Sequence, residues 1–101
     1  MELKYFKLFT QEEVVAPAKV TEDGWYVENP AIMVHLENYK IVLANWLPYT
    51  KIDTGGLIPH DTIALVLDVA DDMVEYYTKW LNPDQVNTIH VNDMGEVQAN
   101  K

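Results

Sequence analysis

The chain has 101 residues, the size of one domain, and 49% of them are apolar, which is enough for a hydrophobic core. Asp and Glu number 16 against 7 Lys, and with no Arg the net charge is −9. This balance argues against broad tracking of nucleic-acid phosphates, which needs basic surfaces. The sequence has no Cys for disulfides, and no apolar run approaches the length of a membrane span. We therefore expect a cytoplasmic protein without membrane contact.

Stretches rich in β-branched and aromatic residues, separated by turn signals, predict five strands, at residues 3–9, 13–20, 25–36, 41–47 and 57–69. Pro17 in the second strand indicates an edge position or a bulge. Asp23-Gly24 before the third strand is a hairpin signal. Asn29-Pro30 interrupts the third strand and favours a kink.

The apolar run at residues 41–47 is closed by Trp46 and stopped by Pro48, and we expect it to be the central strand. Because Trp is large and apolar, Trp46 is predicted to be buried or to line a subunit interface. The loop that follows, residues 48–56, is the longest of the chain.

Residues 57–81 fit a helical stripe throughout, but the first part is rich in β-branched residues, so we predict a strand that ends near Val69. Asp71-Asp72 then places negative charge at the positive end of a helix over residues 71–81. This helix is expected to bury Val74, Tyr77 and Leu81.

Asn82-Pro83 ends the predicted helix. Residues 84–101 are polar apart from five apolar side chains and need support from a sheet edge or a neighbour. The chain is thus predicted to have a domain at residues 1–83 and a polar tail at residues 84–101.

Four motifs carry a resemblance to a known family: Phe-Lys-Leu-x-Thr-x-Glu-Glu-Val-Val-Ala at 6–16, Asn29-Pro30-Ala31, Trp46-Leu47-Pro48-Tyr49 and Ile58-Pro59, followed by a helix. With the order of strands and turns, they make residues 4–82 similar to Sm and Sm-like (LSm) proteins, specifically small Sm-like proteins of marine phage (cyanophage) type. The resemblance implies a mainly β fold: an Sm-like small five-stranded bent antiparallel barrel with a C-terminal helix.

It also implies a homo-oligomeric ring of about five to seven subunits that binds RNA or single-stranded DNA. The chain departs from the Sm pattern at three places. Ala16-Pro17 stands where Sm proteins carry a Gly, Gly24-Trp25-Tyr26 follows Asp23 in the second turn, and Pro59-His60 replaces Arg-Gly in the last turn. The residue type that usually grips a base or phosphate is therefore missing.

The candidate nucleic-acid-binding residues are Trp25, Lys51 and His60. Trp25 beside the Asp23-Gly24 turn is able to stack on a base, His60 to stack or donate a hydrogen bond, and Lys51 to supply charge. For Trp25 the structural alternative is a place in the core, and for His60 an exposed turn without a partner.

The other polar patterns predict no reaction. His35 and Glu37 lie two apart on a strand, but two ligands make a weak metal signal, and we expect neither metal nor cofactor. Glu12 and Glu13 alternate in direction, so they do not converge as an acid–base pair. No nucleophile motif or Gly-rich phosphate loop is present, so an enzyme is not expected.

Two functions remain open. The first is an Sm-like ring that binds RNA or single-stranded nucleic acid in RNA or DNA processing, in the cytoplasm of an infected host cell if the chain derives from a phage. The alternative is an acidic structural or protein–protein interaction module of phage origin that does not bind nucleic acid. The net charge and the missing Arg favour the alternative, whereas the expected fold favours the first.

Overall fold

The computed structural model describes residues 1–82. They belong to two compact units, Met1–Val69 and the described part of Ala70–Lys101. The tail predicted at residues 84–101 lies outside the described residues. No described helix has the length and apolar character that crossing a membrane would require.

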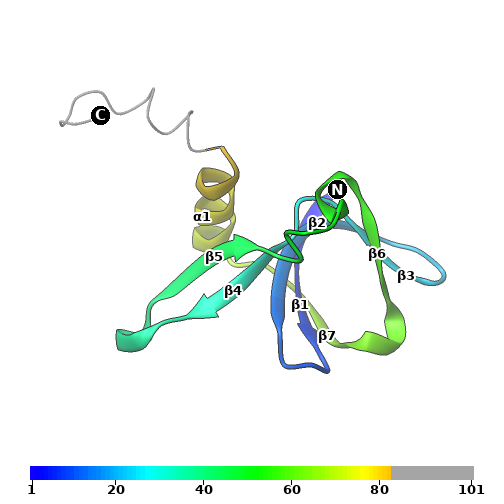
Figure 1. The fold of residues 1–101 in the computed structure, drawn as a ribbon, viewed down its shortest axis with the longest axis horizontal. Helices are drawn as coiled ribbons and strands as arrows, with labels where there is room; N and C mark the ends of the chain where they lie inside the picture. The colour runs from blue at the N-terminus through cyan, green and yellow to red at the C-terminus, as the bar shows by residue number, and fades with distance from the viewer. Residues whose placement is uncertain (83–101) are drawn as a thin grey trace. The chain divides into compact units, whose positions relative to one another are not determined.

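The first unit is mainly β and consists of antiparallel strands joined by short turns (Figure 1). The described strands are β1 (Glu2–Leu8), β2 (Glu13–Val20), β3 (Gly24–Val27), β4 (Ala31–His35), β5 (Ile41–Asn45), β6 (Gly56–Pro59) and β7 (Ile63–Asp68). Three short 3₁₀ turns lie between them, η1 (Glu37–Tyr39), η2 (Ile52–Thr54) and η3 (His60–Thr62). The second unit contains one described helix, α1 (Asp71–Leu81).

The seven strands form one sheet with the order β5-β4-β2-β1-β7, while β3 pairs with β2 and β6. The first half of β2 pairs with β4 through Val14 and Val15, and its second half pairs with β3 from Ala18 to Val20. β3 and β4 are therefore the two halves of the predicted third strand. They are separated at Asn29-Pro30, where Asn29 has a positive φ of 46°.

Because both halves pair with β2, the sheet divides at this kink. Figure 1 shows the β4–β5 hairpin projecting to one side of β1 and β2, with β3 and β6 on the other side. The prediction that residues 41–47 form the central strand is wrong, because β5 pairs only with β4 among the described strands and ends the strand path. β structure over residues 57–69 is confirmed, but the prediction of a single strand there is wrong, because η3 divides it into β6 and β7.

The core of this unit lies between the β1–β2 hairpin and the β3–β6 pair. Phe6 and Leu8 alternate inward along β1, as the two-residue period of a strand requires. The other members of the cluster are Val14, Ala16, Ala18, Val27, Trp46 and Ile58. Trp46 is only 9% exposed, so its predicted burial is confirmed.

The helix α1 has the predicted bounds, and Asp71 and Asp72 occupy its first turn. Tyr77 is buried as predicted, but Val74 and Leu81 are 39% and 38% exposed, so the prediction is wrong for these two. The Tyr77 ring packs against the Trp80 ring, with centroids 5.7 Å apart. Val74 and Leu81 lie about one turn to either side of Tyr77 on the same stripe of the helix, so they border the buried ring without being buried themselves.

Candidate functional site

The turn between β2 and β3 is where the sequence placed Trp25, and the structure brings His60, predicted in the last turn, against it. The turn is closed by Thr21, whose backbone N–H donates to the Gly24 carbonyl over 2.7 Å. The backbone N–H of His60 donates to the Asp23 carbonyl over 3.4 Å, and His60 Nε2 lies 3.0 Å from the Thr21 carbonyl oxygen. Because a carbonyl only accepts, this contact requires the Nε2–H form of the ring. His60 is therefore exposed but held against the turn.

Trp25 lies beside this turn and is half-buried. Its ring meets the fully buried Phe6 ring at a centroid distance of 5.6 Å and an angle of 73°. This edge-to-face geometry is favourable for aromatic pairs. Part of the indole is thus committed to the core, and a base would have to stack on the part that remains accessible.

Lys51 lies at the other end of β6. It precedes η2, and its carbonyl accepts both the backbone N–H and the hydroxyl of Thr54. Trp25 of β3 pairs with Ile58, which lies two residues before His60 at the C-terminal end of β6. Lys51 lies before Gly56, at the N-terminal end of the same strand. The structure therefore brings Trp25 and His60 together and leaves the exposed Lys51 apart from them.

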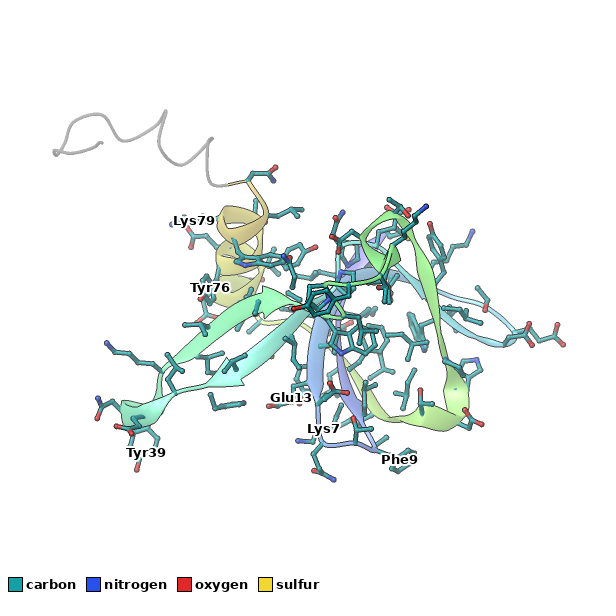
Figure 2. All side chains as sticks on the ribbon, in the orientation of Figure 1. Lys7, Phe9, Glu13, Tyr39, Tyr76 and Lys79 are labelled. Carbon is teal, nitrogen blue, oxygen red and sulfur yellow. The ribbon has the colours of Figure 1, made fainter. Side chains whose placement is uncertain are left out.

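A second polar cluster, which sequence reasoning missed, joins three strands. Tyr5 of β1 donates its hydroxyl hydrogen to Glu13 Oε2 over 2.5 Å, and His35 Nε2 of β4 lies 2.5 Å from Glu13 Oε1. Lys7 is the cross-strand partner of Glu13, and both lie at the same end of the β1–β2 pair (Figure 2). The cluster thus ties β4 to the β1–β2 hairpin.

The electrostatics of this cluster follow from its contacts. The hydrogen bond from Tyr5, followed by that from His35 and the charge of Lys7, lowers the pKa of Glu13, although burial opposes the shift. Burial and then the bond to Glu13 raise the pKa of Tyr5 to about 12. In the register of the β1–β2 hairpin, Tyr5 and Glu13 are diagonal cross-strand neighbours. A hairpin predicted from the sequence with this register would have indicated their contact.

The predicted metal pair is arranged differently. His35 contacts Glu13, while Glu37 lies in η1, after the end of β4. Within residues 1–82, no three His, Asp or Glu side chains converge in a way that could hold a metal ion. Glu12 accepts hydrogen bonds from Thr10 Oγ1 and Trp46 Nε1, so Glu12 and Glu13 contact different partners and do not form an acid–base pair.

Comparison with known proteins adds no assignment. No protein-family model matches this sequence, and no curated protein matches it either. What the chain does must therefore be inferred from its own fold and surfaces.

Proposed function

We propose that this protein is an Sm-like, ring-forming binding protein rather than an enzyme. The observation that carries the proposal is the strand order. β3 and β4 count as one bent strand, whose two halves pair with β6 and β5, and the last strand, β7, returns beside β1. This order supports the bent barrel that the sequence resemblance implies.

Assembly into a homo-oligomer is supported by β7. Among the described strands it pairs only with β1, and its Leu65 and Leu67 side chains are 49% and 48% exposed. An apolar strand at the edge of a sheet is a template for pairing with another chain, and a closed ring protects every such edge. The proposed ring has five to seven subunits, as the resemblance implies.

The proposed ligand of the ring is RNA or single-stranded DNA. Trp25 and His60 would contact the bases from the turn, and Lys51 would add charge at a second position, each repeated around the ring. Because every subunit carries a net charge of −9, binding would be weak and would fall steeply with added salt. The proposed compartment, which the resemblance to phage proteins implies, is the cytoplasm of an infected host cell.

The proposal is tested by sedimentation velocity followed by fluorescence anisotropy with labelled U-rich and A-rich RNA at low salt. We expect a closed oligomer at micromolar concentration, and RNA binding at pH 6 and at pH 8 that weakens as salt is added. A stable monomer would refute the ring. Absence of RNA binding at both pH values, with the ring intact, would refute the nucleic-acid ligand.

A second candidate is an acidic structural or protein–protein interaction module of phage origin built on the same barrel. The arrangement of lysines favours it. Lys4 lies within ion-pair distance of both Asp68 and Glu2, and Lys79 pairs with Glu75, so acidic side chains offset part of the little positive charge present. A negative surface of this kind suits a basic protein partner better than a phosphate chain.

A further inference from the structure

An apolar groove of about 270 Å³ lies within the first unit, and its lining includes Pro59 and Thr62 but neither Trp25 nor His60. It is lined by Thr10 and Glu12 of the β1–β2 turn, by Trp46 and Leu47 after β5, and by Leu57 of β6. Leu47 and Leu57 are 43% and 47% exposed, so the groove opens to solvent. Its volume is at the small end of ligand pockets and suits one long side chain better than a large ligand.

Glu12 is the one charged residue that lines this groove. Thr10 Oγ1 donates to Glu12 Oε1 over 2.9 Å, and Trp46 Nε1 donates to Glu12 Oε2 over 3.3 Å. A carboxylate has about four acceptor positions, so these two bonds fix its orientation and leave further lone pairs available. Within residues 1–82, no lysine or histidine forms an ion pair with Glu12.

We propose that this groove binds a lysine or arginine side chain of a basic protein partner. The apolar walls would cover the methylene stem of such a side chain, and its charged end would reach the Glu12 carboxylate. The net charge of −9 would attract a basic partner and repel an acidic one. This inference rests on the second proposed function, the protein–protein interaction module, and adds that its partner presents a basic side chain.

The groove is built within one copy of the chain, so its binding does not depend on ring closure. Sedimentation tests the ring, RNA anisotropy tests the nucleic-acid ligand, and peptide titration tests the groove. A negative result in one of these experiments therefore leaves the other two proposals unaffected.

The probe is an acetylated and amidated Gly-Ala-Lys-Ala-Gly pentapeptide, titrated into the ¹⁵N-labelled full chain. Because the Trp46 indole N–H donates to Glu12, its resonance reports directly on that carboxylate. Assignment of this resonance uses a Trp46→Phe variant. We expect a saturable shift of the Trp46 signal with the lysine peptide and with its arginine analogue. The norleucine analogue, which lacks the charge, should bind about tenfold more weakly or worse.

The key variant is Glu12→Gln, which removes the charge; its amide oxygen can still accept from Trp46 Nε1 while its amide NH2 donates to Thr10 Oγ1. Its matched control is Glu22→Gln in the exposed β2–β3 turn. We expect Glu12→Gln to weaken binding of the lysine peptide about tenfold, and Glu22→Gln to leave it nearly unchanged. Leu57→Lys places a competing cation in the groove and should weaken binding of the peptide, although Glu12 itself is unchanged. Equal affinity of wild type and Glu12→Gln, equal affinity for the norleucine peptide, or no shift at all would overturn the proposal.

Discussion

At the scale of single residues, Gly24 shows how the absence of a side chain lets two strands meet. A Cβ built at this position would lie 2.2 Å from the backbone oxygen of Ile58, far inside van der Waals contact. Gly24→Ala therefore has to separate β3 from β6 and should lower the free energy of unfolding by about 1–3 kcal/mol. Urea denaturation measures this change. The control is Asp23→Ala, next to it in the exposed turn, and equal stability of the two variants would contradict the argument.

Tyr5 carries a prediction about pH. Its pKa is raised from 10.0 to about 12, so its contribution to stability is present below pH 10 and is lost as the pH rises towards 12. The pKa of Glu13 is lowered, so the contribution of Glu13 is present above about pH 4.5 and is lost as the pH falls through its folded value. Tyr5→Phe should therefore reduce stability at pH 7 by about 1–2 kcal/mol and flatten both pH slopes.

The measurement is urea denaturation of wild type and Tyr5→Phe at pH 4, 7, 10 and 11. Tyr49→Phe is the control because Tyr49 is fully exposed and has no resolved contact with the cluster. Parallel pH profiles of wild type and Tyr5→Phe would show that the hydrogen bond to Glu13 does not contribute in solution.

Trp46 tests the core. It is 9% exposed and belongs to the same cluster as Phe6 and Ile58. Trp46→Ala should cost about 3–5 kcal/mol, because it removes a large side chain from a packed site. Tyr49→Ala removes an aromatic ring from the same connection at a fully exposed position and should change stability little. A small loss of melting temperature in Trp46→Ala would mean that the indole is not core in solution.

At the scale of elements, the sequence predicted those features that depend on neighbouring residues. Asn29-Pro30 located the break between β3 and β4, and Asp71-Asp72 located the start of α1. The position of β5 could not be found in this way. Its apolar composition indicated a central strand, but the kink at Asn29-Pro30 turns β4 away from β3, so the β4–β5 hairpin ends the strand path. Strand order depends on pairing between distant segments, which composition does not encode.

The edge formed by β7 gives a prediction for assembly. Leu67→Lys adds a charge to an exposed position of this strand, and charged residues at a sheet edge oppose pairing with another chain. We expect weaker self-association in sedimentation equilibrium, with little change in the stability of each subunit. Val20→Lys, at a 55% exposed position on β2, makes the same change of charge away from this edge. Equal association of both variants would exclude β7 from the interface.

At the scale of the whole molecule, the candidate sites could be predicted only in part. The sequence placed Trp25 beside the Asp23-Gly24 turn and His60 in the last turn, and the structure brings these two turns together. It could not show that Lys51 lies at the other end of β6, because the loop at residues 48–56 has no periodic pattern. Nor could it show the contact between Glu12 and Trp46, which joins residues 34 positions apart.

The net charge of −9 governs how copies of this chain should associate. Subunits with like charge repel one another, and salt screens this repulsion over a Debye length of about 8 Å at physiological ionic strength. Pairing through β7, whose exposed side chains are mostly apolar, is not itself weakened by salt. We therefore expect self-association to strengthen when salt is raised from low to physiological concentration, as sedimentation equilibrium in a salt series can measure. RNA binding should change in the opposite direction, because phosphate contacts weaken with salt. Association that weakens with salt would instead mean that ion pairs hold the copies together, and the β7 edge would lose its role.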